Sequence, residues 1–287
     1  MFLPKKTLAN KINKFLKEDI GQGDITTTLI PPDTIIEAEV IAKEDGIVAG
    51  IEESVAFLQS QDLQVKPLVS DGESIKKNTV ILRIVGNART LLSAERTLLN
   101  LLSRMSGIAT KTHILIEKTR NANYKTRVAC TRKVAPGLLY FDKKATMLGG
   151  GDTHRLHLDD MVLIKDNHLV IIGDIGGAVK KARETVSFSK KIEIEVSSVD
   201  QALEAAKAGV DIIMLDNFSP RKIREAINLL KKRGLRDKVL IEASGGINEQ
   251  NILEYAATGV DIVSLGEITD SAKALDISLE VTKVKGK

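Results

Sequence analysis

Charged side chains, hydroxyl groups and glycines recur between residues 131 and 267 of this 287-residue chain, mostly at the ends of short apolar runs. In chain order these groups are Thr131-Arg132-Lys133, Lys165-Asp166-Asn167-His168, Glu195, Asp216-Asn217, Ser244-Gly245-Gly246 and Gly266-Glu267. Arginine and lysine bind carboxylates and phosphates, and carboxylates bind metal ions or hydroxyl groups. Because chance placement of polar loop residues is a poor explanation for this ordered set, we interpret it as the lining of one cavity.

Four cations lie in this region, and a fifth stands earlier in the chain. They are Arg132, Lys133, Arg155, Lys165 and Arg96. Most lysines and arginines only solvate a protein surface. A place at strand ends favours a binding role instead, because a guanidinium group presents a planar pair of donors to a carboxylate or a phosphate.

Two glycine-bearing segments end the last two apolar runs. Ser244-Gly245-Gly246 precedes a helix that we expect from near Asn248, and Gly266 precedes another helical stretch. Backbone N–H groups at the start of a helix, with the positive end of its dipole, suit a phosphate. The alternative is that the glycines only permit tight turns; we favour phosphate binding for the pair.

The acidic candidates follow two other strands. Glu193 and Glu195 alternate with apolar residues, so both carboxylates point the same way, and among cations they would stay ionised. Asp216 ends an apolar strand, a usual place for a ligand to a metal or a hydroxyl group. Its alternative role is to cap the helix that follows.

The histidines and the cysteine carry weaker signals. His154 follows three glycines and Asp152, and we interpret it as a loop donor to an anion. A zinc site with His157, three residues later, is the less favoured reading because no cysteine cluster supports it. We expect His157 and His113 to be structural and Cys130 to be a small buried hydrophobe.

The elements that position these groups form a series of strands and helices. The predicted strands are Arg127–Cys130, Met161–Ile164, Ile192–Val196, Asp211–Leu215, Val239–Ala243 and Asp261–Leu265. The predicted helices between several of them are Val199–Ala208, Pro220–Lys232 and Glu249–Thr258. This alternation predicts a parallel α/β sheet with ligands at the carboxyl ends of its strands. About 150 residues are too few for a full eight-stranded barrel, so we expect a reduced or open barrel of six or seven strands.

The first third of the chain has a different pattern. Residues 35–85 predict strands and turns, with Ala38 and Val40 alternating with charged residues. An amphipathic helix is expected over residues 1–20. A second is expected over residues 88–106, with Arg96 on a polar stripe beside its apolar face.

Composition excludes several classes of protein. The apolar fraction is 43% and the charged fraction 28%, which is typical of a soluble globular protein. A net charge of +4 with three tyrosines, six phenylalanines and no tryptophan argues against nucleic-acid binding. No apolar run has the length of a membrane span, and one cysteine cannot form an intrachain disulfide. We therefore expect a cytoplasmic protein.

These residues also carry a family resemblance. The motifs are Gly23-Asp24-Ile25-Thr26-Thr27, Glu95-Arg96-Thr97, Thr131-Arg132-Lys133, Pro136-Gly137, Gly149-Gly150-Gly151, His154-Arg155, Lys165-Asp166-Asn167-His168, Ile194-Glu195-Val196, Leu215-Asp216-Asn217 and Ser244-Gly245-Gly246. Together they resemble the quinolinate phosphoribosyltransferase family, in order and over essentially the whole chain. The chain departs from the family pattern at Leu139, which replaces an arginine, and at Asp270, which replaces a histidine.

The resemblance implies an N-terminal α/β sandwich domain and an open, reduced α/β barrel. The first would comprise residues 1–107 with the C-terminal tail 270–287, and the second residues 108–269. Members of the family transfer the phosphoribosyl group of phosphoribosyl pyrophosphate (PRPP) to quinolinate with Mg²⁺. The products are nicotinate mononucleotide, pyrophosphate and CO₂, on the route to NAD.

The resemblance also implies roles for individual residues. The expected ligands of quinolinate and pyrophosphate are Thr131, Arg132, Lys133, His154, Arg155 and Lys165. Arg96 would reach the site from the neighbouring subunit of a homodimer or larger oligomer. Glu195 and Asp216 would hold Mg²⁺ and the ribose hydroxyls. The expected phosphate ligands are Ser244, Gly245, Gly246, Ser264, Leu265 and Gly266. The catalytic candidates are Lys133, Lys165, Glu195 and Asp216.

Three alternatives remain. A homologous pyrophosphorylase of the molybdate-locus type would act on another substrate, but such relatives depart within the Lys165–His168 block, which is intact here. A Schiff-base aldolase would use Lys165 or Lys133 as its nucleophile. An interaction protein of the same fold would leave the converging charges unexplained.

Overall fold

The computed structural model describes residues 3–285, which divide into two compact units. The first unit contains residues 3–111, 147–149 and 272–285, and the second contains residues 112–146 and 150–271. Among residues 3–285, no helix combines the length and the apolar character that crossing a membrane requires.

The first unit is built on an antiparallel sheet with the strand order β12-β1-β5-β3. These strands span Ile277–Lys285, Ile35–Ala42, Val80–Asn87 and Gln64–Pro67, and β2 (Gly46–Ile47) pairs separately with β4 (Ser74–Ile75). Every second residue of β1 is buried, which confirms the predicted alternation. Ala42 pairs with Ile277, so the C-terminal strand completes a sheet that begins near the N-terminus.

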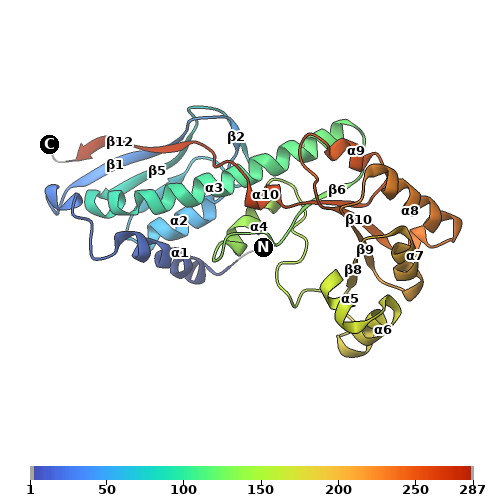
Figure 1. Ribbon diagram of the computed structural model, residues 1–287. Helices are drawn as coiled ribbons and strands as arrows, with labels where there is room; N and C mark the ends of the chain where they lie inside the picture. Colours follow the sequence, from blue (N-terminus) through green and yellow to red (C-terminus); the bar gives the residue numbers. More distant parts are fainter. Residues whose placement is uncertain (1–2, 286–287) are drawn as a thin grey trace. The chain divides into compact units, whose positions relative to one another are not determined.

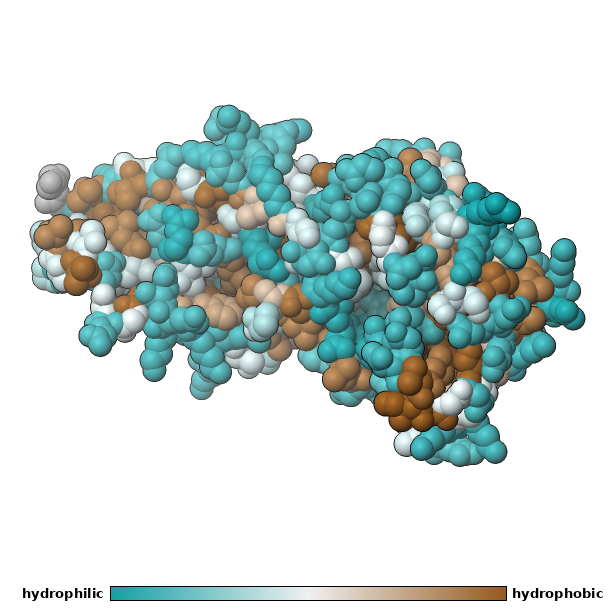
Figure 2. Space-filling view, viewed as in Figure 1, coloured by the Kyte–Doolittle hydropathy of each residue, from teal (hydrophilic) through white to brown (hydrophobic). Residues whose placement is uncertain are grey.

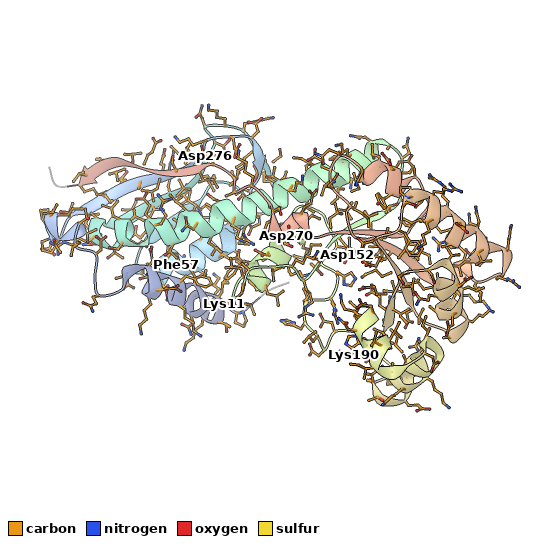
Figure 3. The ribbon with its side chains drawn as sticks, in the orientation of Figure 1. Lys11, Phe57, Asp152, Lys190, Asp270 and Asp276 are labelled. Atoms are coloured by element: carbon orange, nitrogen blue, oxygen red, sulfur yellow. The ribbon has the colours of Figure 1, made fainter. Side chains whose placement is uncertain are left out.

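Helices cover one side of this sheet. They are α1 (Lys5–Ile20), α2 (Ile51–Gln59) and the first part of α3 (Ala88–Asn121), with the short turn η1 (Thr27–Leu29) after α1 (Figure 1). The predicted apolar face of α1 is buried at Leu8, and Phe57 of α2 is 1% exposed (Figure 3). Burial of these faces against the sheet makes the core of the first unit.

The second unit is built on a parallel sheet. Within the described residues it has six strands in the order β6-β11-β10-β9-β8-β7. They span Arg127–Cys130, Ile262–Leu265, Leu240–Ser244, Ile212–Asp216, Ile192–Val196 and Val162–Ile164. The strands β6 and β7 follow one another in the chain but occupy opposite edges, so the sheet stays open. The expected open, reduced α/β barrel is therefore confirmed.

Helices connect the parallel strands. They are α4 (Leu139–Leu148), α5 (Asp166–Ile172), α6 (Ile175–Thr185), α7 (Val199–Ala208), α8 (Pro220–Lys232), η2 (Arg236–Lys238), α9 (Ile252–Ala256) and α10 (Glu267–Asp270). Of these, α6, α7 and α8 lie side by side along the outside of the sheet (Figure 1). The side chains of Ser198 and Ser219 accept backbone N–H bonds and so begin α7 and α8 at the predicted residues.

Several expected bounds were wrong. Helix α3 continues to Asn121 instead of ending near residue 106, and α9 covers only part of the expected Glu249–Thr258. In α5, Val170 and Ile171 are each 84% exposed, and Figure 2 shows an apolar surface patch over this helix. Helix α1 begins at Lys5, and residues 1 and 2 of the expected N-terminal helix lie outside the described residues.

Gly107 lets α3 pass close to the segment before β12. A Cβ atom at this position would lie 2.0 Å from the carbonyl oxygen of Lys273, a distance that only backbone movement could relieve. We expect Gly107→Ala to lower the free energy of unfolding by about 1–3 kcal/mol, measured by urea denaturation. The matched variant Gly176→Ala, also within a helix but only in ordinary contact with Asp174, should leave stability unchanged or raise it by up to about 1 kcal/mol. Equal effects of the two variants would contradict the close approach.

Candidate active site

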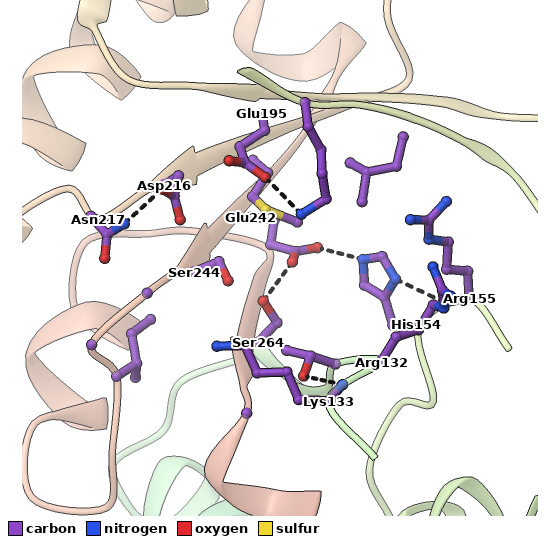
Figure 4. Close-up of a pocket in the computed structure, with 18 residues that line it drawn as sticks. Arg132, Lys133, His154, Arg155, Glu195, Asp216, Asn217, Glu242, Ser244 and Ser264 are labelled. Carbon is purple, nitrogen blue, oxygen red and sulfur yellow. Dashed lines mark hydrogen bonds and ion pairs between the residues drawn. The ribbon is translucent and has the colours of Figure 1, made fainter. Parts of the chain in front are cut away.

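A cavity of about 540 Å³ opens in the second unit, where the parallel strands end (Figure 4). It is lined by Thr131, Arg132, Lys133, His154, Arg155, Leu163, Lys165, Glu195, Met214, Asp216, Asn217, Glu242, Ser244, Gly245, Gly246, Ile247, Ser264 and Gly266. Most of the residues named from the sequence are therefore brought together at one edge of the sheet. The parallel register explains this, because it places Ser244 opposite both Asp216 and Ser264.

Cations dominate one part of the cavity. Arg132 and Lys133 follow β6, Lys165 follows β7, and Arg155 lies on the loop between α4 and β7. Burial lowers the pKa of Arg155, and the nearby charge of Arg132 lowers it further. A guanidinium group that is both half-buried and close to a second cation is favourably placed to receive an anion.

Two carboxylates face the cations. The Oε2 of Glu195, on β8, forms an ion pair with the Nζ of Lys165 at 3.2 Å. Asp216 ends β9, and its Oδ2 accepts a bond from the Nδ2 of Asn217 at 2.6 Å. The alternative role of Asp216 as a helix cap is wrong, because Ser219 caps α8.

The glycine segment after β10 makes a tight turn. Gly245 and Gly246 have φ values of +92° and +65°, and a Cβ atom on Gly245 would lie 2.3 Å from the Oδ1 of Asn217. The helix expected near Asn248 begins only at Ile252, so phosphate binding here would depend on exposed backbone N–H groups and not on a helix dipole.

The strand β11 contributes less to the cavity than expected. Ser264 is 2% exposed, and its hydroxyl donates to the Oε1 of Glu242 at 2.6 Å. Leu265 is buried and does not line the cavity, whereas Gly266 does. At Gly266, a Cβ atom would lie 2.8 Å from the carboxylate of Asp270 and 3.0 Å from the side chain of Lys133. The departure at Asp270 thus places an acid beside a cation of the cavity.

In the wall of the cavity, His154 contacts two fully buried carboxylates. Its Nε2 lies 3.1 Å from the Oε2 of Glu242 and 3.3 Å from the Oε2 of Glu193. Neither carboxylate oxygen of Glu193 makes a hydrogen bond within the described residues. Glu242 did not emerge from the sequence; the signal that could have revealed it is a single acid inside the apolar strand Leu240–Ala243.

This cluster retains an extra proton. Burial opposes a charge on His154, but the neighbouring carboxylates of Glu193 and Glu242 outweigh burial and raise the pKa of His154 to about 10. Burial likewise raises the pKa of Glu193. The amide N–H of Arg155 donates to the Nδ1 of His154 at 2.8 Å, which disfavours a proton at Nδ1 and favours one on Glu193. In either arrangement Nε2 keeps its proton and the three side chains together carry one negative charge.

The loop that carries His154 and Arg155 is anchored on both sides. The backbone of Asp152 pairs with β6 through Val128 and Cys130, and the buried Lys143 of α4 donates to the carbonyl oxygen of Thr153. Burial lowers the pKa of Lys143. Cys130 is buried, as expected.

The remaining candidates lie elsewhere. Arg96 belongs to the first unit, where it lines a different cavity of about 300 Å³ with Asp19 and Asp24. His157 is exposed and close to Asp159 and Asp160, whereas His154 points to the buried acids. The two histidines therefore do not form the zinc site considered above.

Comparisons with known proteins point to one family. The family model described as "Quinolinate phosphoribosyl transferase, C-terminal domain" matches residues 108–280, and the model of the N-terminal domain matches residues 24–106. A "probable nicotinate-nucleotide pyrophosphorylase [carboxylating]" of Methanothermobacter thermautotrophicus is 46% identical over 275 residues, which are 96% of this chain and 99% of the relative. The human "nicotinate-nucleotide pyrophosphorylase [carboxylating]" is 35% identical over 98% of this chain and 94% of its own length.

Solved structures agree with these sequences. The nicotinate-nucleotide pyrophosphorylase from Francisella tularensis superimposes with a TM-score of 0.89 at 38% identity, over 98% of each chain. The crystal structure of NadC from Streptococcus pyogenes gives a TM-score of 0.90 at 34% identity, over 99% of each chain.

The buried cluster predicts a pH dependence of stability. Its extra proton is bound more tightly in the folded state than in the unfolded state, where histidine titrates near 6.5. The stability that it contributes is therefore complete below pH 6.5 and is lost as the pH rises through about 10. Glu193→Gln replaces the protonated acid by a neutral isostere and should remove most of this dependence, a difference on the order of 2 kcal/mol between pH 6 and pH 9. Urea denaturation at several pH values measures it, with the exposed Glu204→Gln as control; parallel curves for wild type and Glu193→Gln would contradict the assignment.

Proposed function

The chain belongs to the quinolinate phosphoribosyltransferase family, and from this premise we propose that it transfers the phosphoribosyl group of PRPP to quinolinate. Nicotinate mononucleotide, pyrophosphate and CO₂ would be its products. The observation that carries this proposal is the convergence of four cations with the carboxylates of Glu195 and Asp216 in one cavity of the second unit.

The cations fit the dianionic substrate. Quinolinate bears adjacent carboxylates on a pyridine ring, and Arg132, Arg155 and Lys165 offer charged donors from three different segments around the cavity. Thr131 and Lys133 follow β6, as Arg132 does, and complete this group of ligands. Lys133 and Lys165 would also balance the charge of the leaving pyrophosphate.

The carboxylates fit the other partner in the reaction. Breaking the bond between ribose and pyrophosphate leaves positive charge at the anomeric carbon, which Glu195 and Asp216 would stabilise while holding the ribose hydroxyls. The backbone N–H groups of Ser244, Gly245 and Gly246, together with Gly266, would bind the 5′-phosphate. Ser264 is buried but lines the cavity, whereas Leu265 is buried and does not line it.

The residues present also fit Mg²⁺. Glu195 and Asp216 offer half-buried carboxylate oxygens on neighbouring strands, and magnesium prefers oxygen ligands. When bound with PRPP, the ion would neutralise the charge that develops on pyrophosphate. Without it, Lys165 already neutralises one of these carboxylates through the ion pair with Glu195.

The proposal includes an assembly. A homodimer would bring Arg96 of one subunit to the cavity of the other, which is consistent with a cation on an exposed stripe of α3 and outside the cavity of its own second unit. The domain bounds 1–107 with 270–287, and 108–269, and the cytoplasmic location, stay predictions.

The reaction itself is the first test. We expect the purified protein to release pyrophosphate only when quinolinate, PRPP and Mg²⁺ are all present, because each supplies one of the charges that the cavity accommodates. A coupled pyrophosphate assay measures it, with nicotinate in place of quinolinate as control. Turnover of nicotinate without turnover of quinolinate would overturn the assignment of the substrate.

A mixing experiment tests the shared site. Arg96→Ala and Lys165→Ala chains should each be nearly inactive alone, because each lacks one cation of every site. Unfolding and refolding the two together should restore up to about a quarter of wild-type activity, since random pairing leaves half of the dimers with one intact site. Mixtures that stay as inactive as either variant would contradict a site shared between subunits.

A further inference from the structure

We propose that Glu242 is a positioning residue, whose buried carboxylate fixes the ring of His154 and through it the direction of the Arg155 side chain. This inference rests on the proposed function, because Arg155 is there a ligand of quinolinate. It gives Glu242 a role that acts through its hydrogen-bond partners in the cavity wall.

Glu242 is fully engaged by the protein. Its side chain is 0% exposed, its Oε1 accepts the hydroxyl of Ser264 at 2.6 Å, and its Oε2 accepts the Nε2–H of His154 at 3.1 Å (Figure 4). A carboxylate with both oxygens bonded and no exposed surface acts on a substrate only through its partners. Those partners come from two different segments, β11 and the loop before β7.

His154 transmits this constraint to Arg155. Its φ of +50° turns the ring back on its own chain, so that Nδ1 accepts the amide N–H of Arg155 at 2.8 Å. The amide of His154 in turn donates to the Oδ1 of Asp152 at 2.8 Å. Since both ring nitrogens are occupied by the protein, His154 could donate to an anion only by leaving Glu242. The ring therefore fixes the position of the Arg155 backbone, from which the guanidinium group reaches into the cavity.

The same side chains are a poor site for a divalent cation. The ligand atoms of His154, Glu193 and Glu242 lie within 4.8 Å of one another, a spacing that a metal ion could bridge. A histidine that binds a metal through one nitrogen normally donates a hydrogen bond from the other. Here Nδ1 accepts a hydrogen bond from the amide N–H of Arg155, so a metal at Nε2 would break the bond that orients this residue.

A carboxylate at position 242 does what a neutral group could not. Its charge strengthens the bond from the imidazole, and charge-assisted bonds are about twice as strong as neutral ones. Glu193 lies 3.3 Å from the same Nε2 and makes no hydrogen bond with it. The geometry thus gives Glu242 alone the bond that defines where the ring points.

The test compares Glu242→Gln with Glu225→Gln, a matched change at an exposed position of α8. Calorimetric titration of the full chain with quinolinate should show about tenfold weaker binding for Glu242→Gln than for wild type, while the KM for PRPP stays within about twofold. In nitrogen-15 histidine spectra, assigned with His154→Gln, the Nε2–H signal of His154 should shift or exchange with water in Glu242→Gln. Glu225→Gln should match wild type in all three measurements.

The outcomes separate the two proposals. An unchanged Nε2–H signal in Glu242→Gln would overturn the positioning role, as would a shifted signal with unchanged quinolinate affinity. Equal losses of affinity for quinolinate and PRPP would also overturn it, because they indicate general damage to the fold. If wild type neither binds nor turns over quinolinate, the proposed function fails, and the spectra alone then decide whether Glu242 holds His154.

Discussion

Like charges repel, and the cavity of the second unit nevertheless gathers four cations where the parallel strands end. Three of them stand near acidic side chains: Lys165 pairs with Glu195, Arg155 lies near Glu193 and Asp160, and Lys133 lies near Asp270. The buried acids are what allow arginines to be held close together before an anion arrives. The arrangement is therefore preorganised, and a dianionic substrate would complete its charge balance.

This charge balance explains why the site combines exposed cations with buried acids. Arg132 and Lys165 are exposed at the cavity, whereas the side chains of Glu193 and Glu242 are 0% exposed. His154 links the buried acids to the cations, since its ring contacts the acids and its neighbour Arg155 faces the cavity. Burial strengthens each hydrogen bond among these acids and raises the free-energy cost of leaving a buried polar group unpaired.

Position at strand ends predicted most of the cavity from the sequence, because the carboxyl ends of parallel strands meet at one edge whatever the loops do. It could not reveal Glu242, whose partners lie 88 and 22 residues away in the chain. Nor could it predict the orientation of the His154 ring, which depends on the positive φ of that residue. Helix starts were predictable where the cap is local in sequence, as with the serines that cap α7 and α8. The start of α9 was not, because the backbone N–H groups of residues 248–251 donate to the side chains of Asn248, Asn251 and Glu267.

The account depends most directly on where a pyridine diacid sits. A crystal structure of the protein soaked with quinolinate would locate it. We predict that its carboxylates contact the guanidinium groups of Arg132 and Arg155 and the ammonium group of Lys165, with the ring of His154 still bonded to Glu242. Quinolinate bound outside this cavity, or with its carboxylates turned away from these cations, would contradict the account.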